Sequence, residues 1–522
     1  MLDIKQDLQR GEAYASRALT GMVTLIETHI SWVFVLERDV FKVKKPVDFG
    51  FLDFRILAQR KAMCEAEVRL NARLAPDVYI GVVPIRVDAN GMAYLGDAGD
   101  IVDWAVHMRR LPDAFRADAL LAAGNLDVTA IDAIAKRIAG FHAGLGVDPS
   151  AAHFGAPSTI ERNLEENFAQ TRATLERYLD AAQADELVRW QRAFLRGHTA
   201  LFEERVRQGR VRDGHGDLRL EHVYLESAAI TILDCIEFNE RFRFADVCAD
   251  IAFLSMDLAG RERVDLAERL LATYARESND FDLYALVDFY ESYRAFVRGK
   301  IAALVADDSS VGLESRARAK EDARRYFLLA LSADRRPLLL PTVVAVGGLI
   351  ASGKSTIAER IAAELNAPIV DADRTRKSML GVAPTQYLPD AAWSGAYDPA
   401  FTDRVYAEVL RRAQVVLESG RPVVVDASFR SEQMRGAFRH LAMMHGAPFR
   451  FIECDAPKDV CRARLERRRG GVSDGRLAIF DDFCARFEPV IELPSTEHVR
   501  IDSTKSMAET MKTLRAELGP GF

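Results

Sequence analysis

Residues 342–356 read TVVAVGGLIASGKST, a run of β-branched residues that leads into a glycine-rich turn. Gly348 is followed by four residues and then by Gly353, Lys354 and Ser355. Glycines at this spacing let successive backbone N–H groups curl around an anion, and a following helix adds its N-terminal dipole. The stretch predicts a phosphate-binding P-loop between a buried strand and a helix over residues 353–365.

The residues around this loop alternate between strand-like and helix-like segments. Strand-like runs are APIVDAD (367–373), RPVVVDASF (421–429) and APFRFIECD (447–455). Apolar strands that alternate with helices predict an α/β domain with a parallel sheet covered by helices on both faces. Ligands bind at the carboxyl ends of such strands, so we expect Asp373 and Asp426 to face the P-loop.

Each side chain near the predicted loop has an expected role. Lys354 reaches the β- and γ-phosphates of a nucleoside triphosphate, and the Ser355 hydroxyl ligates Mg²⁺. Asp373 accepts the proton of an attacking hydroxyl, Arg376 neutralises phosphate charge, and Asp426 holds Mg²⁺ or orients the nucleophile. The alternative for either acid is a helix N-cap after a strand. The remaining nucleotide contacts are assigned to Gly348, Gly353 and Thr356.

A basic segment, CRARLERRRGGVSDGR, occupies residues 461–476. Its arginines form either a solvated charged face or a lid that closes over the transferred phosphate. Arg464 and Arg468 are the candidates for the lid.

The P-loop, VDADRTR (370–376), GRPVVVDASF (420–429) and RLERRRGGVSDGR (464–476) together resemble the small P-loop kinases related to polynucleotide kinase, gluconate kinase and zeta toxin. The resemblance covers nearly all of residues 341–522. It implies ATP and Mg²⁺ as cofactors, Asp373 and Arg376 as the acceptor-side motif, and Arg468 as the lid arginine. Acceptors in these kinases range from sugars and nucleotide sugars to nucleic-acid 5′ ends, so the acceptor stays open.

The remainder of the chain has a different pattern. Residues 1–110 contain strand-like runs with one helical stretch, RILAQRKAMCEAEVRLNARLA, and residues 111–332 are mostly helical. This pattern predicts an α+β, bilobal N-terminal domain. Two prolines in SADRRPLLLPT mark the change of pattern, which places the domains at residues 1–335 and 336–522.

A second candidate phosphate site lies in DGHGDLRLEHVYL (213–225), which is followed by a strand pair that ends at Asp234. A loop acid that receives a hydroxyl proton and a second acid that holds Mg²⁺ are typical of a protein-kinase-like site, and Asp217 and Asp234 fit these roles. Upstream, Lys42 is expected to bind the α- and β-phosphates, with Glu67 as its ion-pair partner. The backbone of residues 106–108, ending at Met108, is expected to meet adenine.

These segments resemble the aminoglycoside phosphotransferase and choline kinase superfamily over residues 20–300, and in particular the predicted-kinase branch that is often joined to a P-loop kinase. The sequence departs from the pattern twice. ETHISW (27–32) has no glycine-rich loop, so phosphate contact there falls to Ser31 and nearby backbone. His222 stands where the superfamily has a metal-binding Asn, and imidazole suits Mg²⁺ less well than oxygen donors do.

Three functional hypotheses follow. The chain is a pair of ATP-dependent kinases, or a P-loop kinase with a non-catalytic sensor or acceptor-binding domain, or an ATP-hydrolysing switch. The net charge of −7 favours a small-molecule acceptor over a nucleic-acid 5′ end. The six cysteines are scattered, and no apolar run is long enough to span a membrane, so we expect a cytoplasmic protein without a membrane partner.

Overall fold

The computed structural model describes residues 2–14, 23–28, 30–48, 53–226, 229–309, 311–331, 340–388, 393–467, 472 and 477–518. The chain forms two compact units, which consist of Met1–Asp257 with Tyr293–Arg324, and of Leu258–Ser292 with Arg325–Phe522. The predicted boundary between residues 335 and 336 lies outside the described residues. Residues 258–292, which the sequence pattern assigns to the N-terminal domain, group in space with the P-loop part.

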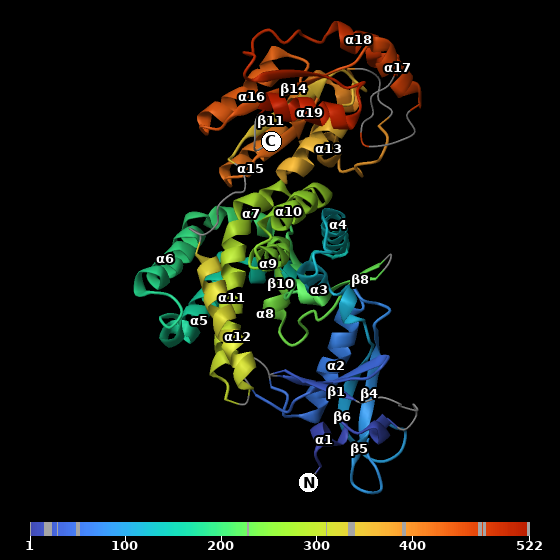
Figure 1. The fold of residues 1–522 in the computed structure, drawn as a ribbon, viewed down its shortest axis with the longest axis vertical. Coiled ribbons are helices and arrows are strands. Elements are labelled where there is room, and N and C mark those ends of the chain that lie inside the picture. The colour runs from blue at the N-terminus through green and yellow to red at the C-terminus, as the bar shows by residue number, and fades with distance from the viewer. Residues whose placement is uncertain are drawn as a thin grey trace. The chain divides into compact units, whose positions relative to one another are not determined.

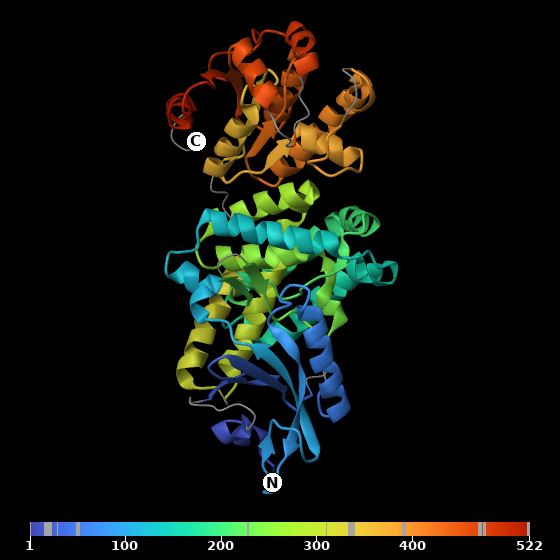
Figure 2. The ribbon, with the colours of Figure 1, turned by 90° about the vertical axis from the view of Figure 1, so that its right-hand side faces the viewer.

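The N-terminal unit contains a six-stranded antiparallel sheet in the order β1-β2-β3-β6-β4-β5. The strands are β1 (Thr24–Glu27), β2 (Ser31–Val35), β3 (Asp39–Lys44), β4 (Tyr79–Val87), β5 (Ala93–Tyr94) and β6 (Ile101–Arg109). Helix α2 (Leu57–Asn71) packs against β4 and β6, as Figures 1 and 2 show. The alternation of apolar residues buries Phe34, Phe41 and Val43 in one core with α1 (Ile4–Asp7) beside it. The predicted α+β small lobe is confirmed.

The rest of this unit is mostly helical, as expected. Its helices are α3 (Ala117–Ala122), α4 (Val128–Gly144), α5 (Pro157–Leu175), α6 (Ala181–Gly197), α7 (Thr199–Arg207) and α8 (Glu240–Arg243). Helices α9 (Val247–Ala259), α11 (Val287–Asp307) and α12 (Leu313–Ala330) have residues in both units. This unit also contains two short antiparallel strand pairs. They are β7 (Val211–Asp213) with β10 (Phe244–Asp246), and β8 (Val223–Glu226) with β9 (Ala229–Ile232). In the sequence, the His-Gly-Asp loop lies between β7 and β8.

The C-terminal unit is built on a parallel sheet in the order β12-β13-β11-β14-β15. The strands are β11 (Val343–Gly348), β12 (Ile369–Asp371), β13 (Val423–Asp426), β14 (Phe449–Asp455) and β15 (His498–Asp502). Helices α13 (Lys354–Leu365) and α19 (Met507–Leu518) pack on one face, and α15 (Pro399–Glu418) and α16 (Glu432–Met444) on the other. The predicted α/β fold with both faces covered is confirmed. The unit also contains α10 (Val264–Ser278), α14 (Ala372–Met379), α17 (Lys458–Arg467) and α18 (Phe480–Ala485).

The structure differs from the sequence-based expectation at two strands. The second strand of this unit ends at Asp371 instead of Asp373, because the Asp371 side chain accepts a hydrogen bond from the Arg374 amide and caps α14. Strand β15 was not predicted, because it lies at the sheet edge and alternate residues are exposed. Within the described ranges, no helix is long and apolar enough to cross a membrane.

Candidate nucleotide and acceptor sites

The P-loop has the tight backbone that its glycines predict. Gly348 has φ 139° and Gly353 has φ 95°, both in the region that favours glycine. A Cβ on Gly348 would lie 2.5 Å from the carbonyl oxygen of Cys454. The loop is held from outside, because Arg464 donates to the Ala351 carbonyl over 3.2 Å. The Ser503 hydroxyl likewise donates to the Ser352 carbonyl.

This geometry assigns Arg464 to the support of the P-loop, because its second terminal nitrogen donates to the Ser503 carbonyl over 2.8 Å. Arg468, the other arginine expected in a lid, lies outside the described residues.

We predict that Gly348→Ala removes nucleotide binding while most of the fold survives. The added methyl group would meet a backbone oxygen that cannot move without shifting β14. The measurement is the increase in melting temperature caused by ATP and Mg²⁺, which should disappear. Gly420→Ala is the matched control, because Gly420 has φ 81° but open space around it. That variant should lose some stability, about 1–2 kcal/mol, and keep the ATP-induced shift. An undiminished shift in Gly348→Ala would contradict the phosphate-binding role of the loop.

Two carboxylates meet at the carboxyl edge of the sheet beside the P-loop. Asp371 and Asp426 are register partners on the parallel strands β12 and β13, and both are buried. Burial, followed by the charges of Asp426 and Asp373, raises the pKa of Asp371 to about 7. Asp373 was expected at the end of this strand, but Asp371 occupies that position and Asp373 lies in α14.

Asp426 lies next to Lys354 and Ser355 at the start of α13. Burial raises the pKa of Asp426, while the Lys354 charge and a hydrogen bond with Ser355 act in the opposite direction. The second carboxylate oxygen, Oδ1, is buried and has no hydrogen-bond partner in the described part of the chain. A hydroxyl next to a carboxylate with an open oxygen is the kind of donor pair that Mg²⁺ prefers, so these residues fit the metal predicted here.

The acceptor-side motif lies on α14. Asp373 is half-buried in the first turn of the helix, and its charge raises the pKa of both Asp371 and Asp426. Arg376 is buried, and its guanidinium donates to the Ala396 carbonyl and to the Thr402 hydroxyl. The expected contact of Arg376 with phosphate stays a prediction that requires the guanidinium to leave these partners. Thr356, assigned to the nucleotide, is exposed in the first turn of α13.

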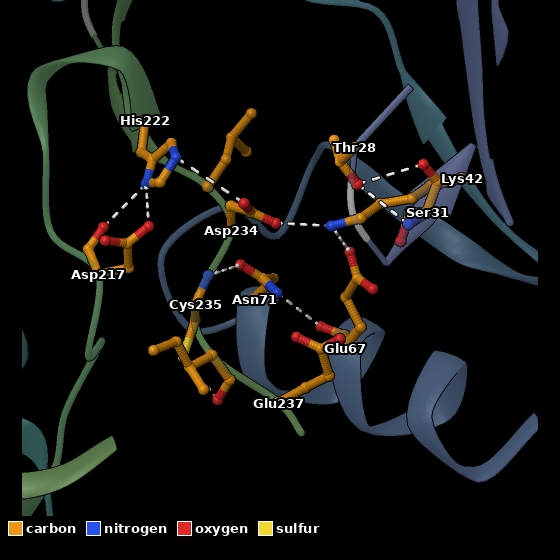
Figure 3. Close-up of polar contacts among 12 residues, drawn as sticks. Thr28, Ser31, Lys42, Glu67, Asn71, Asp217, His222, Asp234, Cys235 and Glu237 are labelled. Carbon is orange, nitrogen blue, oxygen red and sulfur yellow. Dashed lines mark hydrogen bonds and ion pairs between the residues drawn. The ribbon is translucent and has the colours of Figure 1, made fainter. Parts of the chain in front are cut away.

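In the N-terminal unit, one ion-pair network joins the predicted lysine, glutamate and aspartate (Figure 3). The Lys42 Nζ lies 2.9 Å from Glu67 Oε1 and 2.6 Å from Asp234 Oδ1. Burial alone would lower the pKa of Lys42, but the charges of Asp234 and Glu67 outweigh it and hold the pKa well above its usual value. Glu65, two residues before Glu67 on α2, is exposed and pairs with Lys61 instead.

A second lysine, Lys44, extends this network and was missed from sequence. It is fully buried and pairs with Glu67 over 2.5 Å and with Glu237. Lys44 follows Lys42 by two residues on β3, so the strand period places both on one face. That spacing, together with Glu237 three residues after Asp234, was the signal in the sequence. The two lysines share Glu67, which fixes the position of α2 relative to β3.

We predict that Lys44→Met destabilises the N-terminal unit by about 3–5 kcal/mol, because Glu237 is left as a buried charge without its partner. Calorimetry of the thermal unfolding of this unit measures the loss. Adding Glu237→Gln to the same chain should restore part of it, since the buried charge is then removed. Lys45→Met is the control, because Lys45 pairs with the exposed Glu27 and should cost at most about 1 kcal/mol. Equal stabilities of the two single variants would contradict the prediction.

The His-Gly-Asp loop is held by two acids of α9 that the sequence analysis did not single out. The Asp250 carboxylate accepts from the backbone amides of His215 and Gly216, over 2.6 and 2.9 Å. Asp257 accepts from the Leu220 amide over 3.0 Å. Burial lowers the pKa of His215 to about 4, so this ring is neutral at physiological pH. Its Nε2 lies 2.8 Å from the Leu233 carbonyl and therefore donates to it.

Asp217 is ionised, and its carboxylate is already paired with an arginine. Arg219 donates to both of its carboxylate oxygens, over 2.9 and 2.8 Å. Although burial opposes ionisation, Arg219 and His222 hold the pKa of Asp217 well below its usual range. An acid with so low a pKa is a weak general base, so its chemical role would be to orient a hydroxyl group more than to remove its proton early.

His222 is directed towards Asp234, as Figure 3 shows. Its Nδ1 donates to the Asp217 carbonyl over 2.8 Å, which leaves the Nε2 lone pair free to accept. Nε2 lies 3.8 Å from Asp234 Oδ2, and Arg219 lies 3.3 Å from the same nitrogen. Asp234 itself has φ 62°, a conformation that is uncommon outside functional sites and turns.

Asp234 and His222 could supply only some of the ligands that a divalent cation needs. Among the residues that the structure describes, no three His, Cys, Asp or Glu side chains form a metal-binding group. Mg²⁺ in phosphotransferases is commonly held by one or two carboxylates together with substrate phosphates. Nucleotide phosphates would therefore have to complete the coordination here.

The other two predicted contacts with the nucleotide lie within the sheet. Ser31 is buried at the start of β2, and its Oγ lacks a hydrogen-bond partner among the described residues. Met108 lies inside β6, opposite Val40 of β3 and Tyr79 of β4. Strands flank Met108 on both sides, and its expected contact with adenine stays a prediction.

A family model described as an AAA domain matches residues 343–490. Uncharacterized proteins of Mycobacterium tuberculosis and Mycobacterium bovis are 33% identical to this chain over 462 residues, which are 88% of this chain and 89% of each relative. Among solved structures, a choline kinase from Cryptosporidium parvum is 12% identical and covers 59% of this chain and 88% of its own, with a TM-score of 0.36. A gluconokinase from Sinorhizobium meliloti is 23% identical and covers 35% and 93%, with a TM-score of 0.26.

The family match confirms the P-loop resemblance of the C-terminal part. In the N-terminal part, the sheet, α2 and the His-Gly-Asp loop follow one another in the order that the resemblance predicted. Neither solved structure assigns a substrate to this chain.

Proposed function

Because this chain belongs to the family of the mycobacterial proteins that it matches over 89% of their length, we propose that the whole family couples two kinase domains in one chain. Each domain is proposed to transfer the γ-phosphate of ATP to a hydroxyl group, with Mg²⁺ as the metal. We further propose a cytoplasmic location and a small-molecule acceptor. The acidic net charge of −7 supports the small-molecule acceptor over a nucleic acid.

In the C-terminal domain, the observation that carries the proposal is the pair Asp371 and Asp426 beside the P-loop. Lys354 at the start of α13 would neutralise the β- and γ-phosphates, and Ser355 and Asp426 would hold Mg²⁺, which supplies charge neutralisation on the transferred group. Asp373, half-buried in the first turn of α14, would accept the proton of the attacking hydroxyl. Asp371, with a pKa raised to about 7 by burial and its neighbours, would hold a proton nearby.

In the N-terminal domain, Lys42 would bind the α- and β-phosphates while Glu67 and Lys44 keep it in place. Asp234 and His222 face each other, so they are the residues that would hold the metal. Asp217 would orient the acceptor hydroxyl, and Arg219, already in contact with Asp217, would neutralise charge on the transferred phosphoryl group.

The proposal is tested by a search for phosphorylated products by mass spectrometry. The full chain is incubated with ATP, Mg²⁺ and a panel of sugars, nucleosides, amino alcohols and 5′-hydroxyl oligonucleotides. Phosphorylation of a small hydroxyl compound is expected. Phosphate release without any phosphorylated product would support the ATP-hydrolysing switch instead. Phosphorylation of an oligonucleotide, with binding that weakens steeply with salt, would replace the small-molecule acceptor.

The bidentate contact of Arg219 with Asp217 favours one alternative for the N-terminal domain. If the arginine stays on both carboxylate oxygens when nucleotide binds, it competes with the acceptor hydroxyl for Asp217 and weakens that carboxylate as a base. The domain would then bind a nucleotide or acceptor as a sensor for the P-loop kinase.

A further inference from the structure

The C-terminal end of α10 contacts three helices around the P-loop site. Asn279, which ends α10 with φ 51°, donates from its side-chain amide to the Ser378 hydroxyl of α14 over 2.6 Å. Its side-chain oxygen accepts from Arg412 of α15 over 2.8 Å. The same nitrogen of Arg412 lies 3.2 Å from the Thr375 hydroxyl, so Asn279 and Arg412 together hold two turns of α14.

Arg276, one turn before Asn279, contacts the P-loop helix. Its terminal nitrogen lies 2.8 Å from Glu359 Oε1 on α13. The Arg276 carbonyl accepts from Arg374 of α14 over 3.4 Å, and Arg374 also lies 3.6 Å from Glu277. The Nε of Arg276 is buried and finds no hydrogen-bond partner in the described part of the chain. The Arg276 guanidinium is therefore held through its contact with Glu359 and not through Nε.

A separate set of contacts holds the remainder of this segment. Arg421 pairs with Glu268 over 2.7 Å and with Asp288 over 2.9 Å. Arg421 precedes β13, so these pairs lie at the amino edge of the sheet, opposite the edge that carries Asp426. Arg421 therefore anchors the segment, whereas the contacts of Arg276 and Asn279 lie beside the helices that border the site.

We propose that the end of α10, residues 276–279, is a positioning element for the acceptor side of the P-loop site. The inference rests on the proposed kinase function of that site. Helix α14 begins at the strand end and carries Asp373 and Arg376. Asn279 binds Ser378 in the second turn of α14, and Arg412, which also donates to Asn279, lies within hydrogen-bond distance of Thr375 in its first turn. The P-loop itself is held independently by Arg464 and Ser503. Loss of the α10 contacts should therefore impair the acceptor side and leave ATP affinity intact.

The charge of Arg276 supports this assignment. Burial and neighbouring carboxylates raise the pKa of Asp371 and of Asp426, and Arg276 acts in the opposite direction on both. Arg276 is therefore a cation close to the acids of the site, and it comes from a helix that precedes the P-loop in the chain.

The test uses the full chain with Asn279→Gly, which permits the positive φ but removes the side-chain amide. Hydrogen exchange of the α14 amides should become about 10-fold faster, because hydrogen bonds that fix the helix are lost. The kcat for ATP hydrolysis in the presence of Mg²⁺, with water as the acceptor, should fall about 10-fold. Binding of a fluorescent ATP analogue should not change. Unchanged exchange in α14 would overturn the proposal, whatever the activity.

Further variants separate positioning from general docking. Asn279→Asp keeps an acceptor for Arg412 and can accept from the Ser378 hydroxyl in place of donating to it, so it should retain more of the wild-type kcat than Asn279→Gly. Arg276→Gln should lower kcat, and Arg276→Lys should restore most of it. Asp282→Asn is the control, because it removes only a partly exposed ion pair with Arg411 in the same segment and should behave as wild type.

If Lys354→Ala hydrolyses ATP as fast as the wild type, the proposed kinase function is wrong. The rate of hydrogen exchange in α14 then still shows whether the end of α10 holds that helix in place. If turnover depends on Lys354 but Asn279→Gly and Arg276→Gln retain wild-type kcat, the inference alone is wrong.

Discussion

Lys354→Ala is expected to lower the rate of product formation at the P-loop site by about 10²–10³-fold, the loss typical when one preorganised charge-stabilising donor is removed. Lys354 is the first residue of α13 and lies close enough to Asp426 to lower the pKa of that carboxyl. Without Lys354 the charge on the transferred phosphoryl group has no fixed cation from the P-loop. Steady-state rates with the acceptor found by product screening measure the effect.

Lys458→Ala is the matched control for this variant. Lys458 is also the first residue of a helix, α17, but it is exposed. Its replacement should leave the rate within about twofold, because a surface charge contributes little. Equal rates for Lys354→Ala and the wild type would rule out the P-loop as the site of transfer.

Asp217→Asn is expected to lower product formation at the N-terminal site by about 10²–10⁴-fold, the range found for positioned acid–base groups. The amide keeps the shape of the side chain but loses the charge that pairs with Arg219 and that would orient the acceptor hydroxyl. The phosphorylated product assigned to this domain is measured while the P-loop domain is silenced by Lys354→Ala.

Asp265→Asn is the control for loss of an arginine–aspartate pair. Asp265 binds Arg263 through both oxygens at the same two-residue spacing, but the pair is partly exposed at the start of α10. Product formation should not change in this variant. If Asp217→Asn also leaves every product unchanged, the two-kinase hypothesis is wrong and the N-terminal domain is a sensor or acceptor-binding module.

Much of the fold could be predicted because its signals are local. Apolar strands alternating with helices predicted the parallel sheet, and the strand runs before residue 110 predicted the antiparallel one. Strand β15 was missed because an edge strand with exposed alternate residues has no continuous apolar run. The end of β12 was misplaced by two residues because a cap, formed by Asp371 with the Arg374 amide, decides where α14 begins.

The candidate sites were predicted less completely. Lys42, Glu67 and Asp234 were expected together, and the structure brings them within ion-pair distance. Lys44 was overlooked, because a buried lysine cannot be told from an exposed one in the sequence unless its buried acids are known. The elevated pKa of Asp371 was equally hidden, since it arises from burial and from Asp426, a residue of another strand.

Residue spacings within single strands, turns and helices were enough to predict the P-loop and a parallel-sheet part that follows an α+β part. The tertiary structure alone decided which charges share a buried site and that Asn279 contacts Ser378, 99 residues further along the chain. The physical reason is that a motif is formed by neighbours in sequence, whereas burial, pKa and helix position depend on whatever the folded chain packs beside them.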